Sequence, residues 1–328
     1  MGPPVAASAL ALAAASGNCC QGEAMLLLVL ELAPCLLGGI ALGRLRPQLP
    51  EQLAPPLLRW GVPISLVGLL LKGGLHRSNL QAALFSLMLV GCGLLLTQRA
   101  PLLQNLLPLP SQQLGAVVGN TAYFGLPVAL ALLPPEALSF SITYDFVGTL
   151  VTWGLGPLLL DGQRAQPRQV LNTPVVRAVL VAVPLMASPW HAAMAAALWW
   201  PARLVLWLML LLVGMRLARL LDQRLEADGL APALLIKLLA LPGAALLSCL
   251  ALGWPAPLRD ALVLQAAAPT AMSVLLLAEA SQQKSREAIP AAQLVLWSTL
   301  LALLSVPLWW WLLNQPMLQP GLQATVAM

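Results

Sequence analysis

The chain has 328 residues, of which 59% are hydrophobic and 9% are charged, and its formal net charge is +5. The charged share is about a third of the ~25% that is usual in soluble domains, which excludes an ordinary soluble protein and predicts a polytopic membrane protein. The small positive charge is spread over short loops, where membrane topology explains it, and nothing indicates nucleic-acid binding.

Apolar runs of about 20 residues predict an all-α protein with ten transmembrane helices. In chain order they lie near residues 24–43, 53–71, 79–97, 112–133, 137–160, 174–189, 193–215, 232–253, 262–278 and 289–313. Residues 1–22 contain no Lys or Arg, so they lack the positive segment of a secretory signal, and we expect an N-terminal tail.

Basic residues are unevenly divided between the two sets of loops. The loops after the odd-numbered spans carry most of them, which places these loops in the cytoplasm of an inner or plasma membrane and both termini on the non-cytoplasmic side. This side holds Arg44, Arg46, Arg99, Arg164, Arg168, Arg216, Arg219, Arg224, Lys284 and Arg286, against Lys72, Arg77 and Arg259 on the other. Arg59, Arg177 and Lys237 lie near cytoplasmic span ends, where we expect their side chains to snorkel to the interface.

Two of the spans contain residues that interrupt a helix. In span 4, Gly119 costs roughly 1 kcal/mol of helix propensity and Pro127 removes a helical hydrogen bond, so we expect helix breaks at both. Span 9 is interrupted by Pro269. Broken backbone at membrane depth is tolerated only where protein buries it or where it lines a wet cavity, so these spans predict a transporter binding site.

An internal repeat relates the two halves of the chain. A displacement of 150 residues lays spans 1–5 on spans 6–10, and it places Gly119 on Pro269 and Asn120 on Thr270. Five spans per repeat is an odd number, so the second repeat must be inverted, with the broken helices 4 and 9 crossing near the bilayer midplane. We therefore expect Gly119 and Pro269 to lie close together. The predicted parts are a tail (1–22), a first repeat (23–160), a cytoplasmic linker (161–173), a second repeat (174–314) and a C-terminal tail (315–328).

Short motifs at the interruptions resemble those of a known family. Gly119-Asn120-Thr121 followed by Gly125-Leu126-Pro127 is similar to the core motif of the auxin efflux carrier family, and Gln265 to Ala271 is similar to its second crossover helix. The short loop between spans 5 and 6 resembles the bacterial-type members. The resemblance implies a ten-helix, inverted-repeat carrier of small carboxylates.

The candidate substrate-binding residues are Gly119, Asn120, Thr121, Gln265, Pro269 and Thr270. Half-helix N-termini carry about half a positive charge each and can bind a carboxylate without a lysine, and these polar side chains would add donors beside them. The alternative is that Asn120 and Thr121 only cap the freed backbone.

Charged residues within the spans are a second set of candidates. Ser141, Asp145, Thr149 and Thr152 share one face of span 5, which should turn away from lipid. Glu31 in span 1 and Arg203 in span 7 are also costly in hydrocarbon. Asp145 or Glu31 could relay a proton or charge, or Arg203 could form a structural pair with one of them.

The sequence therefore predicts a secondary transporter that moves small organic anions, chiefly carboxylates, by alternating access. The alternative is a sodium-coupled symporter of the bile-acid type, which has the same crossover architecture. We expect no enzyme activity, no cofactor and no bound metal, with coupling to protons or to sodium, and a homodimer stays an open alternative to a monomer. An intramembrane aspartyl protease is excluded because Pro157 follows Gly154-Leu155-Gly156 where such an enzyme needs an aspartate.

Overall fold

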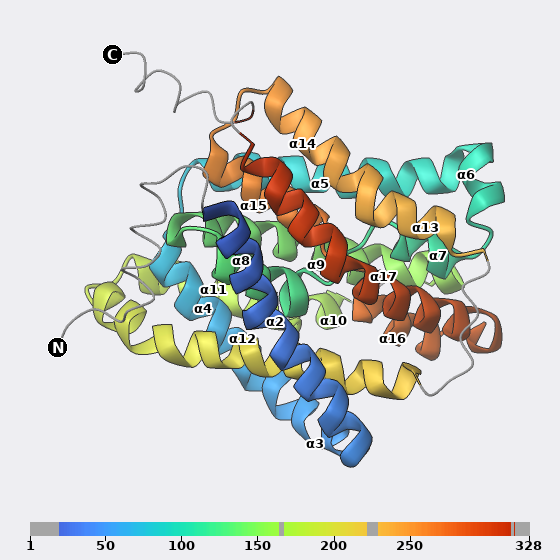
Figure 1. Ribbon diagram of the computed structural model, residues 1–328, viewed down its shortest axis with the longest axis horizontal. Coiled ribbons are helices and arrows are strands. Elements are labelled where there is room, and N and C mark those ends of the chain that lie inside the picture. Colours follow the sequence, from blue (N-terminus) through green and yellow to red (C-terminus); the bar gives the residue numbers. More distant parts are fainter. Residues whose placement is uncertain (1–19, 164–166, 222–228, 316–317, 319–328) are drawn as a thin grey trace.

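The computed structural model describes residues 20–163, 167–221, 229–315 and 318, and these residues form helices and connecting loops without any β-strand (Figure 1). Side chains of residues 20–32 and 169 lie outside the description. Most of the two predicted tails, the linker residue Arg164 and the loop residue Arg224 also fall outside the described residues.

The first half of the chain contains a helical stretch at each of its five predicted places. Their bounds are α2 (Cys20–Leu45); α3 (Leu49–Pro56), η1 (Leu57–Gly61) and α4 (Val62–Gly73) in succession; α5 (Ser78–Arg99); α7 (Pro110–Gly115) followed by η2 (Thr121–Gly125) and α8 (Leu126–Leu132); and α9 (Pro135–Asp161). A short helix, α6 (Pro101–Leu106), joins α5 to α7.

The second half also contains a helical stretch at each of its five predicted places. Their bounds are α11 (Pro174–Met186); α12 (His191–Leu221); α13 (Ala231–Leu235), η3 (Ile236–Ala240) and α14 (Leu241–Ala251) in succession; α15 (Ala256–Ala266) followed by α16 (Met272–Ala280); and α17 (Lys284–Leu313). The short α10 (Pro167–Leu171) precedes α11.

Five helical stretches of the described residues are long and apolar enough to cross a membrane, namely 49–73, 78–99, 191–221, 231–251 and 284–313. Shorter apolar helices lie at 33–45, 121–132 and 174–186. This agrees with a membrane protein that has several apolar helices.

Two stretches are interrupted, and their interruptions lie side by side. The non-helical residues are 116–120, between α7 and η2, and 267–271, between α15 and α16, and we call them the paired segments. The Asn120 N–H donates to Pro269 O at 2.6 Å, the Ala271 N–H donates to Val118 O at 3.1 Å, and Gly119 and Thr270 form an isolated antiparallel bridge. This contact agrees with the predicted proximity of Gly119 and Pro269.

The expectation that Pro127 breaks a helix is wrong. Pro127 lies at the start of α8, which continues directly from the π-helical turn η2. The π-turn pairs each N–H with a carbonyl five residues earlier, so the turn widens to admit a residue that has no N–H and whose ring would collide with the carbonyl four residues before it.

The same device recurs at two other prolines. Each of η1, η2 and η3 is followed by one residue and then a proline, at positions 63, 127 and 242. The carbonyls four residues before Pro63 and Pro242 find other donors, because Arg59 O accepts from the Arg177 guanidinium at 3.4 Å and Leu238 O accepts from the Trp309 indole at 2.9 Å. Helices of this chain therefore absorb these prolines without breaking.

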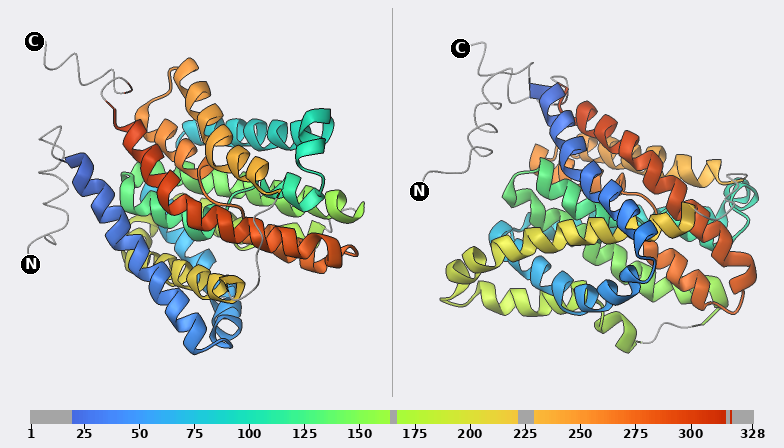
Figure 2. Two further views of the ribbon diagram at one scale, coloured as in Figure 1. Left: turned by 45° about the vertical axis from the view of Figure 1, so that its right-hand side comes forward. Right: turned by 60° about the horizontal axis from the view of Figure 1, so that its bottom comes forward.

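α12 packs closely against α2 at glycine positions, and the two helices lie together in both views of Figure 2. A Cβ at Gly39 would lie 2.2 Å from Leu211 O, and one at Gly214 would lie 2.3 Å from Leu36 O. Glycines let the two backbones approach, which is how apolar helices associate where lipid provides no hydrophobic driving force. α12 also packs against α4, so it joins the two halves of the chain.

Candidate substrate site

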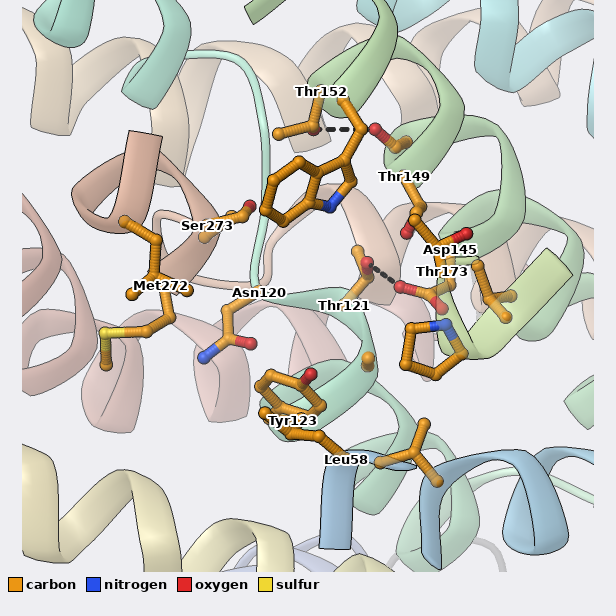
Figure 3. A pocket seen from close by; sticks show the side chains of 18 of the residues that line it. Leu58, Asn120, Thr121, Tyr123, Asp145, Thr149, Thr152, Thr173, Met272 and Ser273 are labelled. Carbon is orange, nitrogen blue, oxygen red and sulfur yellow. Dashed lines mark hydrogen bonds between the residues drawn. The ribbon is translucent and has the colours of Figure 1, made fainter. Parts of the chain in front are cut away.

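A cavity of about 810 Å³ lies on one side of the paired segments. Its deep end is built from the starts of two helices, with Asn120 to Tyr123 at the start of η2 and Ala271 to Ser273 at the start of α16. Figure 3 shows Asn120 and Thr121 between Met272 and Ser273 on one side and Asp145 and Thr149 on the other. The cavity therefore begins where two interrupted helices restart.

The start of η2 offers donors to this cavity. Asn120 O accepts the N–H groups of Phe124 and Gly125, both at 3.1 Å, so these are the first helical hydrogen bonds of the turn. The N–H groups of Thr121, Ala122 and Tyr123 precede them and have no helical acceptor. Such an end carries about half a positive charge, which favours an anion.

The Asn120 side chain adds a further donor. Asn120 is 4% exposed, and its Nδ2 has no hydrogen-bond partner among the described residues. Leaving a buried amide donor without a partner costs about 1–3 kcal/mol of stability. A ligand that brings a hydrogen-bond acceptor to Asn120 Nδ2 would remove this cost.

Asp145 lies at the same end of the cavity. The Thr121 hydroxyl donates to Asp145 Oδ1 at 2.5 Å, while Asp145 Oδ2 has no partner among the described residues. Asp145, Thr149 and Thr152 of α9 all line the cavity, whereas Ser141 of the same polar stripe does not and instead donates to Ala137 O. An anion near Asn120 would therefore meet the Asp145 carboxylate.

The other end of the cavity is basic. We call Arg59, Arg168, Arg177 and Arg216 the arginine rim; they line the cavity from η1, α10, α11 and α12. Arg59 and Arg168 are exposed, and Arg59 and Arg177 both stack on the Trp60 ring. Between the rim and the paired segments the walls are largely apolar, with Leu58, Tyr123 and Trp153 among them. The cavity thus joins a positive entrance to a polar end.

Three of the six predicted binding residues line the cavity and three do not. Gly119, Asn120 and Thr121 are in its wall. Pro269 accepts the backbone bond from Asn120, and Thr270 is held by Gly115 O at 2.9 Å and by Ser298 Oγ at 3.0 Å. Gln265 is fully buried against Gly125, and neither side-chain amide atom has a partner among the described residues.

Of the other two predicted charged residues, only Arg203 has a described side chain, and it does not line the cavity. Glu31 lies in the part of α2 whose side chains are outside the described residues. The Arg203 guanidinium stacks over Trp199 and Trp200 at 5.7 and 5.5 Å, and among the described residues it forms no ion pair with Asp145.

The prediction that the Lys237 side chain reaches the membrane interface is wrong. Lys237 does not snorkel: the residue is 0% exposed, and its Nζ donates to Ala266 O at 2.7 Å, beside the second paired segment. Its ammonium lies instead at the carbonyl end of α15, where a helix carries a partial negative charge that favours a cation. The aromatic residues Tyr123 and Trp153 and the arginine rim were not among the predicted site residues, since only spatial proximity brings them together.

The family comparison concerns the second half of the chain. No curated protein matches the chain. A protein-family model matches residues 163–310, which contain the second paired segment, whereas Asn120, Thr121 and Asp145 precede them. Residues 163–310 match the model of the family described as membrane transport protein, so this part of the chain is similar to transporters.

Proposed function

We propose that this protein is a secondary transporter of small organic anions, chiefly carboxylates, of the bacterial auxin efflux carrier type. The observation that carries the proposal is the cavity that joins the arginine rim to Asn120 and to two helix starts. Helix starts at unwound segments are where transporters hold anionic substrate groups. The match of residues 163–310 to membrane transport proteins supports the same class.

In this proposal the chain crosses the membrane ten times as two inverted five-helix repeats, and the paired segments are the crossover. The cavity lining includes the exposed Arg59 and Arg168, which lie next to the basic loops that we assign to the cytoplasm. The conformation described is then inward-facing. Alternating access would close the arginine rim and open the opposite side of the paired segments, where Gln265 is now buried without partners.

Protons are the coupling ion that the site favours. Asp145 and a bound carboxylate would compete for the Thr121 hydroxyl and for the positive helix start. A proton on Asp145 removes this repulsion, so anion and proton would move together. The other ionisable groups that line the cavity are Tyr123 and the four arginines of the rim.

Uptake by proteoliposomes tests this function directly. Purified full-length protein is reconstituted, and uptake of radiolabelled malonate and benzoate is measured with and without a pH gradient. Uptake above that of protein-free vesicles, accelerated by an inward proton gradient, is expected for at least one probe. Binding of either probe also raises the melting temperature. Absence of both uptake and stabilisation for every small carboxylate tried would reject the proposed substrate class.

The orientation has its own test. In a chain whose native cysteines are replaced by serine or alanine, Arg168→Cys should resist a membrane-impermeant thiol reagent in intact cells, and Arg77→Cys should react. The opposite pattern would place the termini in the cytoplasm.

A further inference from the structure

Lys237 is a buried cation for which the proposed transport cycle has so far given no role. It lies in η3, in a helical stretch that precedes α15, and its ammonium contacts the last residue of α15. Among the described residues it forms no ion pair with a carboxylate. Burial of a lysine without a counter-charge costs several kcal/mol, so something else must stabilise it.

The carbonyl end of α15 supplies this stabilisation. The last four carbonyls of a helix lack helical partners and together carry about half a negative charge. Val263 O and Gln265 O accept the N–H groups of Ala267 and Ala268, and Ala266 O accepts Lys237 Nζ. The ammonium therefore completes the end of this half-helix.

The equivalent end of α7 is completed by a neutral group. Gly115 O, at the last residue of α7, accepts the hydroxyl of Thr270 at 2.9 Å. The two half-helices that end at the paired segments thus differ by one full charge. This asymmetry places a cation at one half-helix end and a hydroxyl at the other.

The missing side chain of Gly119 makes room for the ammonium. A Cβ at position 119 would lie 3.2 Å from Lys237 Nζ and 3.4 Å from its Cε. Gly119 also lines the substrate cavity. Only the bare backbone of the first paired segment therefore separates the ammonium from the end of the cavity where an anion would bind.

Carriers with crossed, broken helices commonly bind a coupling sodium ion at unwound carbonyls and half-helix C-terminal ends. We propose that the Lys237 ammonium occupies this position as a tethered cation, so that the protein binds and moves its anion without sodium. The inference rests on the proposed function and deepens it, because it selects between the proton and sodium alternatives. Unlike a sodium ion, a tethered ammonium stays in place through the whole cycle and adds no transported charge.

The ligand-free protein gives a test that does not depend on the substrate. Melting temperatures of the full-length protein are measured in sodium, potassium and choline chloride at equal ionic strength. The wild-type protein should melt at one temperature in all three salts. A rise specific to sodium and saturable with its concentration would overturn the inference, whatever the protein is found to transport.

Variants then test whether the charge itself acts. Lys237→Ala should lower the melting temperature, and n-butylammonium, which can enter the vacated space, should restore part of the loss in this variant but not in wild type. Lys237→Met keeps the length without the charge, and it should bind malonate or benzoate about tenfold more weakly. Lys284→Ala, which removes an exposed lysine at the start of α17, serves as the control for both measurements.

The outcomes separate the two proposals. Lys237→Met protein that binds the probe as tightly as wild type would reduce Lys237 to a packing residue. If Lys237→Ala does not fold, probe binding by Lys237→Met and the melting temperatures of wild type in the three salts still test the inference. Failure of every carboxylate to bind would reject the proposed substrate while leaving the salt series of the ligand-free protein valid.

Discussion

The two paired segments are alike in their backbones, since each is a non-helical stretch between two helices. They differ in the hydrogen-bond partners of the polar side chains beside them. Asn120, the last residue of the first, has a side-chain amide without a hydrogen-bond partner among the described residues, and Thr121, which follows it in η2, donates to the Asp145 carboxylate. In the second, the Thr270 hydroxyl donates to Gly115 O, and the Thr270 N–H donates to Ser298 Oγ. Threonine at a helix interruption can thus either hold a charged group of the cavity or join two helices. We therefore propose that the first segment serves binding and the second holds helices together.

The largest expected effect separates binding from folding at Asn120. Asn120→Ala should weaken carboxylate binding by about tenfold to a hundredfold, since a hydrogen bond to a charged ligand is worth roughly 1.5–3 kcal/mol. Because Nδ2 has no protein partner among the described residues, the melting temperature should hardly change. Both quantities are measured on one preparation. Wild-type affinity together with a lowered melting temperature would mean that Asn120 is a cap.

The second segment should behave in the opposite way. Thr270→Val keeps the shape but leaves Gly115 O without its donor, which should lower the free energy of unfolding by about 1–3 kcal/mol. Thermal melting detects this loss, and the affinity of the surviving protein for the probe should stay within about twofold of wild type. Thr121→Val is the matched variant: it should alter binding or its pH dependence. If the two variants changed probe affinity and thermal stability equally, the two segments would not differ in role.

Removal of the Asp145 charge tests whether this carboxylate repels the anion and carries the proton. Asp145→Asn removes the repulsion between the site and a carboxylate, so binding near neutral pH should tighten by about tenfold, or ~1.4 kcal/mol. Uptake should at the same time lose its response to the pH gradient. Binding titrations at several pH values and proteoliposome uptake measure the two effects. A variant whose uptake still follows the proton gradient would exclude Asp145 as the proton carrier.

The smallest effect is expected at the arginine rim. Arg168→Gln should reduce the affinity by about two- to threefold at low ionic strength and by less at physiological salt, because exposed charges are screened beyond about 8–10 Å. A salt series of uptake rates checks this. Arg286→Gln, an exposed arginine outside the cavity lining, is the control. A loss that persists at high salt would indicate direct contact with the anion.

Apolar runs and the 150-residue correspondence were sufficient to predict the helical stretches and the proximity of Gly119 and Pro269. These features depend on hydropathy and on residues that interrupt helices, and both can be read directly from a sequence. The expected break at Pro127 is absent because the helix widens into the π-turn η2 before the proline. Such widening depends on the packing of the surrounding helices, as at Pro242, where the Trp309 indole donates to the freed carbonyl of Leu238.

The site could be predicted only in part. Gly119, Asn120, Thr121 and Asp145 were identifiable because polar residues and glycine are rare in apolar spans. The direction of the Lys237 side chain and the assembly of the arginine rim were not, since both depend on how distant helices pack. Gln265 and Thr270 matched the same pattern as Asn120 and Thr121, yet they face protein, because the pattern marks a break and does not say which side of it is hollow.

The π-turns also let the helices carry extra residues. A π-turn holds about one residue more than an α-turn, so deletion of one residue from η3 would restore ordinary α-helical spacing and leave the buried side of α14, with Ala245, Leu246 and Cys249, in nearly its present direction. The same deletion would press the ring of Pro242 against the carbonyl four residues before it. The prolines at positions 63, 127 and 242 therefore mark turns in which the described helices hold an extra residue, and a deletion there should be tolerated only when the proline is replaced as well.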